Sequence, residues 1–325
     1  MRILIVGGAG YLGGALTNIL MPSQHEILVY DFLLYEESYR KQVPFVRGDV
    51  RDHEKLKRYL NWADVVVWLA ALVGDPACAL NETLTIDINE RSIEFLRDTF
   101  DGRVIFTSSC SVYGASNEML TESSSIQPLS LYARTKTNAE KILEDSNAVI
   151  FRLGTLYGIS DDFSRIRFDL VVNTLAMRAA LHRKIIVYGG AQYRPLLHVR
   201  DAAQAIASQL ERPSTTGLYN LHSENRTILD ISECIKQFFP DVEIETSGVA
   251  FQDNRNYRVS SDRAQRELGF SPKHAIGDGI QQLKALLEEG RIKDSFTTRF
   301  SNYLYLKPLL SEYESPLGRV IKHNL

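Results

Sequence analysis

Short apolar runs alternate with amphipathic stretches through the first half of the chain. The apolar runs cover residues 2–8, 25–32, 44–50, 63–72, 102–109 and 148–158. Strands that are apolar at almost every position are typical of a parallel sheet that is covered on both faces. Helical patterns lie between several runs, as at residues 11–20, 51–61 and 88–100. This alternation predicts an α/β fold, a Rossmann-type doubly wound parallel sheet.

The alternation of strands and helices becomes less regular after Gly158. A smaller mixed α/β lobe is expected there, interleaved with the end of the sheet. Helices are predicted at residues 165–183 and 228–239, and strands at 184–189 and 217–222. The last segment is polar and aromatic without clear periodicity, and it is either an interface arm or a partly ordered extension. The chain is therefore divided into a sheet domain, a lobe and a C-terminal extension, at residues 1–158, 159–290 and 291–325.

Composition argues against nucleic-acid-binding, disulfide-rich and membrane-spanning proteins. The 325 residues are 44% hydrophobic and 24% charged, and the net charge of -3 gives no argument for a nucleic acid or a membrane surface as partner. Three cysteines are an odd number, which argues against a disulfide framework and for a reducing compartment. No apolar run approaches a membrane span and no signal-like segment precedes the first strand, so a cytoplasmic location is expected.

Three glycines follow the first predicted strand. Gly7, Gly10 and Gly13 have G-x-x-G-x-x-G spacing at the start of the predicted helix. Glycines there permit a tight turn and a close backbone approach, and the helix N-terminus faces a pyrophosphate. A glycine-rich turn without a ligand is the alternative, because a lone glycine motif is a weak signal.

Two carboxylates strengthen the dinucleotide interpretation. Asp31 closes the second strand, 18 residues after Gly13, where an acid is expected to bond the adenosine ribose. A carboxylate at this place disfavours the extra phosphate of NADP, so NAD is the predicted cofactor and residues 1–158 are predicted to bind it. Asp49 follows the third strand, where it either contacts the adenine edge or only forms a turn. No metal site is predicted.

Tyr132 and Lys136 lie four residues apart in a predicted helix, and therefore on the same face. A free phenol has a pKa of roughly 10 and is mostly protonated at neutral pH. A nearby ammonium and the positive charge of a nicotinamide would favour the phenolate, a base for a sugar hydroxyl. Taken alone, the pair is better explained as an incidental helical pattern.

These motifs together resemble one family. The glycines, Asp31 and the segments at 48–50, 69–71, 107–114, 132–136 and 194–201 stand in the order and spacing of the extended short-chain dehydrogenase/reductases. The likeness is to the nucleotide-sugar epimerase and dehydratase branch, and it covers residues 1 to 285.

The resemblance implies roles for residues beyond the motifs already described. Tyr132, Lys136 and Ser109 would be catalytic, with Ser109 bonding the same sugar oxygen as Tyr132. The cofactor would also contact Tyr11, Leu12, Val50, Leu69, Ala70 and Ala71. The substrate, a nucleotide-diphosphate sugar, would contact Ser109, Ser111, Asn173, Arg194 and Arg255. Surface or capping positions are alternatives for Asn173, Arg194 and Arg255, and a homodimer is expected from the family only.

The resemblance also bears on the reaction. The 4,6-dehydratases of the family carry an Asp-Glu pair after the catalytic Ser or Thr, whereas this chain has Cys110 and Ser111. Neither supplies a carboxylate, so elimination of water is not expected. Cys110 is interpreted as a strand-end residue because no activating base is evident for a thiol nucleophile. NAD-dependent oxidation at C4, most simply in an epimerase, is the leading hypothesis.

Other functions stay open from the sequence. Residues 69–78 and 151–173 resemble a sub-branch that includes a GDP-heptose 4-dehydrogenase. A 4-dehydrogenase or 4-keto reductase is therefore the alternative enzyme. Thr155 replaces the usual Asn before Tyr-Gly, and Ile159 replaces the usual Pro after it, which leaves the sugar undetermined. An NAD-binding regulator without turnover is less favoured, because such members tend to lack the Tyr-x-x-x-Lys pair.

Overall fold

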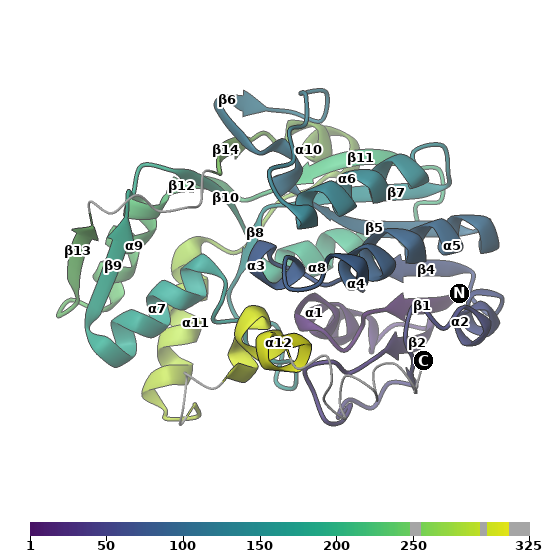
Figure 1. The fold of residues 1–325 in the computed structure, drawn as a ribbon, viewed down its shortest axis with the longest axis horizontal. Coiled ribbons are helices and arrows are strands. Elements are labelled where there is room, and N and C mark those ends of the chain that lie inside the picture. The colour runs from purple at the N-terminus through teal and green to yellow at the C-terminus, as the bar shows by residue number, and fades with distance from the viewer. Residues whose placement is uncertain (248–254, 293–297, 312–325) are drawn as a thin grey trace.

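A seven-stranded parallel sheet forms the centre of the molecule (Figure 1). The computed structural model describes residues 1–247, 255–292 and 298–311. The strand order is β3-β2-β1-β4-β5-β7-β11. The strands are β1 (Arg2–Val6), β2 (Glu26–Asp31), β3 (Phe45–Arg47), β4 (Val65–Trp68), β5 (Arg103–Ser109), β7 (Ala148–Leu153) and β11 (Gly217–Leu221). The order reverses between β1 and β4, which confirms the Rossmann-type fold and marks where its ligands bind.

Helices cover both faces of this sheet. One face carries α1 (Tyr11–Leu20), α8 (Val199–Ser208) and α10 (Asp262–Leu268), and the other carries α2 (His53–Leu60), α5 (Ser92–Thr99) and α6 (Leu131–Leu143). Successive strand residues point to opposite faces. In β1, Ile3 and Ile5 pack under the first set of helices, whereas Leu4 and Val6 pack under the second set. Burial on both faces explains why β1 is apolar throughout.

Shorter elements connect the strands of the first half. The connection from β4 to α5 contains α3 (Asp75–Cys78), α4 (Glu82–Ile86) and a π-helical turn at Asp87–Arg91. A 3-10 turn at Cys110–Tyr113 and strand β6 (Ala115–Leu120) follow β5. The predicted helix at 88–100 is thus the π-helical turn continued by α5.

The lobe contains three small sheets and a helical cluster. The sheets pair β8 (Thr155–Tyr157), β10 (Tyr193–His198) and β12 (Glu224–Thr227), then β9 (Lys184–Tyr188) with β13 (Glu243–Ser247), and β6 with β14 (Asn256–Val259). The helices α7 (Val171–His182), α9 (Ile228–Phe238) and α11 (Ile276–Glu288) share an apolar core. Strand β11 lies in the range predicted for the lobe, yet it is the edge strand of the main sheet.

Two predicted elements differ from the structure. The single strand expected at 148–158 is two strands, because the chain leaves the main sheet at Gly154 and β8 pairs with β10 instead. The helix expected from residue 165 begins at Val171. Before it, the backbone N–H of Phe168 donates to Phe300 O at 2.9 Å instead of to a preceding helical turn.

The C-terminal segment returns to the junction between lobe and sheet. It contains a 3-10 turn at Thr298–Phe300 and helix α12 (Asn302–Ser311), the yellow helix in the lower middle of Figure 1. The remainder of the predicted extension lies outside the described residues, apart from Arg291 and Ile292. In the part of the chain that the structure describes, no helix is long and apolar enough to cross a membrane.

Candidate active site

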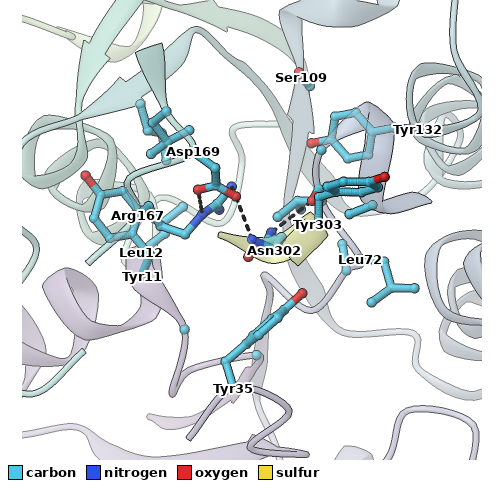
Figure 2. Close-up of a pocket in the computed structure, with 18 of the residues that line it drawn as sticks. Tyr11, Leu12, Tyr35, Leu72, Ser109, Tyr132, Arg167, Asp169, Asn302 and Tyr303 are labelled. Carbon is cyan, nitrogen blue, oxygen red and sulfur yellow. Dashed lines mark hydrogen bonds and ion pairs between the residues drawn. The ribbon is translucent and has the colours of Figure 1, made fainter. Parts of the chain in front are cut away.

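A pocket of about 820 Å³ lies at the carboxyl ends of the sheet strands, beside the lobe. Its walls come from the glycine turn, the ends of β2, β4 and β5, the first turns of α6, the start of α7, and α12. Both halves of the molecule therefore contribute to one cavity. Figure 2 shows the central side chains of this pocket, with Ser109 and Tyr132 on one side and Tyr11, Leu12 and Arg167 on the other.

The glycine turn has no room for side chains at two of its three motif positions. Gly7 has φ +85°, and a Cβ atom on it would lie 2.4 Å from Ala70 N. A Cβ atom on Gly13 would lie 2.5 Å from Gly8 O. Gly10 precedes the first turn of α1 and provides no side-chain cap, so the N-terminus of α1 faces the pocket with its amide groups. This backbone cradle suits the pyrophosphate of a dinucleotide.

Asp31 lies at the end of β2, on the pocket wall. Its carboxylate accepts hydrogen bonds from Ala9 N at 3.0 Å and Leu33 N at 2.7 Å. Burial raises the pKa of Asp31, and the two backbone donors oppose the rise. The donors hold the carboxylate next to the glycine turn, where the sequence predicts a ribose contact.

Asp49 also lines the pocket, but its carboxylate already has strong partners. It accepts from the backbone N–H of Arg51 at 2.8 Å and from the Arg51 guanidinium at 2.9 and 3.0 Å. These bonds stabilise the turn after β3, which was the alternative role for Asp49. Val50, next along the chain, lines the pocket as well.

The other predicted cofactor contacts surround the same cavity. The pocket wall includes Tyr11, Leu12, Leu69, Ala70 and Ala71. The Tyr11 hydroxyl donates to Gly158 O at 2.5 Å, so it ties α1 to the segment after β8. The residues present thus fit a dinucleotide: a glycine cradle at a helix N-terminus, a carboxylate beyond it, and an apolar strip after β4.

The predicted catalytic residues meet at the end of β5. Ser130 caps α6, since its Oγ accepts from Ala133 N at 3.1 Å and donates to Asp75 at 2.7 Å. This cap places Tyr132 in the first turn of α6, opposite Ser109 (Figure 2). One turn further on, Lys136 Nζ donates to Thr107 O at 2.8 Å. Two adjacent elements, β5 and α6, therefore position all three predicted catalytic side chains.

Burial controls the pKa values of this group. It raises the pKa of Tyr132 above its usual value, and a hydrogen bond with Ser109 only opposes the rise. Burial also lowers the pKa of Lys136 to about 8. From the sequence, the ammonium and the nicotinamide charge together are expected to favour the phenolate. In the chain by itself, burial is the larger influence, and the pKa of Tyr132 is raised. A further positive charge in the pocket would favour the phenolate.

The predicted substrate residues divide into two groups. Ser111, Arg194 and Arg255 line the pocket. Ser111 is buried, and its hydroxyl has no hydrogen-bond partner in the described part of the chain. Arg255 pairs with Asp75 at 2.8 Å. Asn173 is instead fully buried away from the pocket, where its amide bonds Gly158 N at 3.0 Å. It is neither at the surface nor in contact with the cavity.

Sequence reasoning missed a polar group at the centre of the pocket. Arg165, Arg167 and Asp169 line it, and the guanidinium of Arg167 pairs with Asp169 at 2.6 Å. Asn302 and Tyr303 of α12 line it too (Figure 2). The sequence signal for this group was the presence of three charged residues within residues 165–169, at the start of the helix predicted at 165–183. Nothing in the sequence pattern places residues 302 and 303 beside residue 132.

The structure excludes Cys110 as a nucleophile in this form. It is buried, its Sγ donates to Arg152 O at 3.2 Å, and burial raises the pKa of its thiol. A metal site finds no support either, since the described residues contain no group of three or more His, Cys, Asp or Glu that could hold an ion.

Comparisons with known proteins agree with this architecture. The chain is 25% identical over 316 residues to an uncharacterised UDP-glucose epimerase of Bacillus subtilis, covering 86% of this chain and 96% of that protein. It is also 25% identical over 298 residues to UDP-glucuronic acid decarboxylase 6 of Arabidopsis thaliana, covering 86% and 87%. A solved UDP-glucose 4-epimerase of Thermotoga maritima superposes with a TM-score of 0.78 at 19% identity, covering 90% of this chain and all of that one.

These relatives are named for different reactions, so they leave the reaction of this chain open. The sequence model of the NAD dependent epimerase/dehydratase family matches residues 3–221, which is more than half of the chain. With the glycine cradle, the Tyr132–Lys136 pair and this match, the chain belongs to the NAD dependent epimerase/dehydratase family and is an NAD-dependent enzyme.

Proposed function

We propose that the protein oxidises C4 of a nucleotide-diphosphate sugar and, most simply, returns the hydride to the other face as a 4-epimerase. The observation that carries the proposal is the convergence of Ser109, Tyr132 and Lys136 on the pocket that contains the glycine cradle. When bound, NAD supplies a positive charge and accepts the hydride. Beside that charge, Tyr132 would first lose its phenol proton to solvent; the phenolate would then take the proton of the sugar hydroxyl, and Ser109 would bond the same oxygen.

Lys136 has a positioning and electrostatic role in this scheme. Its ammonium is 4.8 Å from the centre of the Phe106 ring and is held by Thr107 O, so it stays beside the first turn of α6. A fixed cation near the developing phenolate lowers the cost of removing its proton. The ammonium would also bond the ribose next to the nicotinamide, as the family resemblance implies.

The segment after Ser109 argues against elimination of water. Cys110 is buried with a raised pKa, and Ser111 is neutral, so neither can act as the carboxylate base that a dehydratase needs. Ser111 offers an unpartnered hydroxyl to the pocket, which suits a sugar oxygen. Oxidation and reduction at one carbon need no such carboxylate.

Arg194 and Arg255 are the proposed diphosphate contacts. Both line the pocket on the lobe side, and Arg194 is 5% exposed. A guanidinium can bond two phosphate oxygens at once. A homodimer, expected from the family resemblance alone, and a cytoplasmic location, expected from the sequence, remain predictions.

A panel of UDP-, GDP-, CDP- and dTDP-sugars tests the reaction, with NADH absorbance and product structure as readouts. An epimerase gives an interconverted sugar without net NADH. NADH accumulation with a 4-keto sugar would instead support the GDP-heptose type of 4-dehydrogenase, and net oxidation of added NADH with a keto sugar would support a reductase. No conversion of any member of the panel would contradict the proposal.

A further inference from the structure

Helix α12 forms one wall of the cofactor pocket. The residues of this segment that line the pocket are Ser301, Asn302, Tyr303, Leu306, Leu309 and Leu310. They face the same cavity as the glycine turn and Asp31, although they come from the opposite end of the chain. In Figure 2, Tyr303 lies beside Tyr132 and Asn302 lies across from Arg167.

Asn302 anchors the first turn of α12 through three bonds to two other segments, the stretch before α7 and the stretch after β4. Its backbone N–H donates to Asp169 Oδ2 at 2.8 Å, and its Nδ2 donates to Val73 O at 2.9 Å. Its Oδ1 accepts a hydrogen bond from Arg165. Asn302 is 1% exposed, so its polar groups depend on these protein partners. Buried polar groups are costly to leave unpaired, which makes this position specific.

An apolar face holds the rest of the helix. Leu306 is 2% exposed and packs with Leu72, Ala77 and Cys78 from the segment after β4. Leu304, two residues earlier, is 46% exposed. The helix is therefore docked by one face only, and substitutions on its two faces should have different effects.

The apolar cluster around Leu306 reaches both ends of the cofactor pocket. Tyr35, four residues after the predicted ribose contact Asp31, packs against Tyr305 with ring centroids 5.2 Å apart. Tyr132, at the catalytic end, belongs to the cluster that contains Leu306. Arg165 lies 4.0 Å over the Tyr35 ring and donates to Arg299 O at 2.6 Å. Helix α12 thus contacts both ends of the cofactor pocket.

We infer that α12 is a retaining wall that slows the exchange of NAD and NADH, with Asn302 as the positioning residue that holds it closed. The inference goes beyond the proposed function and rests on cofactor binding, not on which sugar reacts. Slow exchange suits an enzyme that regenerates its cofactor in place, because the reduced form has to stay until the hydride returns.

The test measures NADH dissociation directly, without any sugar. The protein is loaded with NADH, mixed rapidly with excess NAD, and followed by the fluorescence of the bound NADH. Asn302→Ala and Leu306→Ala should each release NADH about tenfold faster, the change expected from losing a buried contact. Leu304→Ala is the matched control on the exposed face and should release NADH at the parent rate.

Tyr303→Ala keeps the test valid if the buried substitutions impair folding. Tyr303 lines the pocket, is half-buried, and no hydrogen bond ties it to other described residues. Tyr303→Ala should also release NADH faster, and its melting temperature without cofactor should fall less than that of the two buried variants, because Tyr303 is only partly buried against the cluster. Parent-like release in folded Asn302→Ala, Leu306→Ala and Tyr303→Ala proteins would overturn the inference. That result would leave the sugar-panel experiment, and so the proposed function, unaffected.

Discussion

A buried ion pair beneath the catalytic helix provides a quantitative test of how α6 is held. Glu140 of α6 and Arg152 of β7 are 7% and 4% exposed, and their nearest atoms are 2.6 Å apart. Ser108 donates to the same carboxylate, and Arg152 Nη1 donates to the Tyr113 hydroxyl Oη at 2.9 Å. Glu140→Gln removes the counter-charge and leaves the guanidinium buried. Breaking such a pair costs about 3–5 kcal/mol of unfolding free energy.

The assay is urea unfolding followed by far-ultraviolet circular dichroism, with Glu144→Gln as the control. Glu144 ends the same helix but is exposed, so its substitution should stay within about 0.5 kcal/mol of the parent. Replacing Glu140 and Arg152 together by methionine should recover most of the loss, because no buried charge then remains. A loss below about 1 kcal/mol for Glu140→Gln would refute the reasoning that this pair holds α6 against the sheet.

Three further predictions follow from the pocket and the lobe. Gly13→Ala puts a methyl group 2.5 Å from Gly8 O, so NAD affinity measured by titration should fall at least about tenfold; parent-like affinity would contradict the cradle. Burial lowers the pKa of His198 to about 4, below the usual 6.5 of the unfolded chain, so the unfolded state binds more protons between these values. The resulting contribution to the unfolding free energy, about 3 kcal/mol, is present above pH 6.5 and is lost as the pH falls towards 4. His198→Gln should therefore make the unfolding free energy less dependent on pH between 4 and 6.5. An unchanged pH dependence would exclude His198 as the cause. Arg194→Met should raise KM for the nucleotide sugar about tenfold with NAD binding unchanged, whereas an unchanged KM would remove Arg194 from the substrate site.

The sheet half of the fold was predictable because its signal is local. A strand such as β1 is buried on both faces and is therefore apolar at almost every position, and the helix predicted at residues 11–20 has the bounds of α1. The cofactor-binding role of the glycines and Asp31 could be predicted from the sequence for the same reason. They occupy one continuous strand-turn-helix unit and the end of the next strand.

The lobe and the far wall of the pocket depend on contacts between distant segments. Gly154 makes the last bond to the edge strand, from its N–H to Leu221 O at 2.8 Å, and the break after β7 occurs because Thr155–Tyr157 then pair with β10. The late start of α7 reflects bonds from Phe168 and Asp169 to residues 300 and 302. Helix α12 carries Pro308 in its interior and lacks a strong periodic pattern, so its position was visible only in three dimensions.

The pKa of Tyr132 shows a different limit of sequence reasoning. Four-residue spacing correctly placed Tyr132 and Lys136 one turn apart, but spacing carries no information on burial. Burial raises the pKa of the phenol and lowers that of the ammonium to about 8. Removal of the phenol proton therefore depends on the charge of the bound cofactor more than on the Tyr132–Lys136 pair alone.

The most direct test of the central claim compares Tyr132→Phe with the parent protein, both loaded with NAD. A reactive nucleotide sugar from the panel is added, and the absorbance of bound NADH and the conversion of the sugar are followed together. We predict that Tyr132→Phe binds NAD with parent affinity but converts the sugar at least about 100-fold more slowly, because the group that accepts the hydroxyl proton is gone. Conversion by Tyr132→Phe at the parent rate would contradict the account.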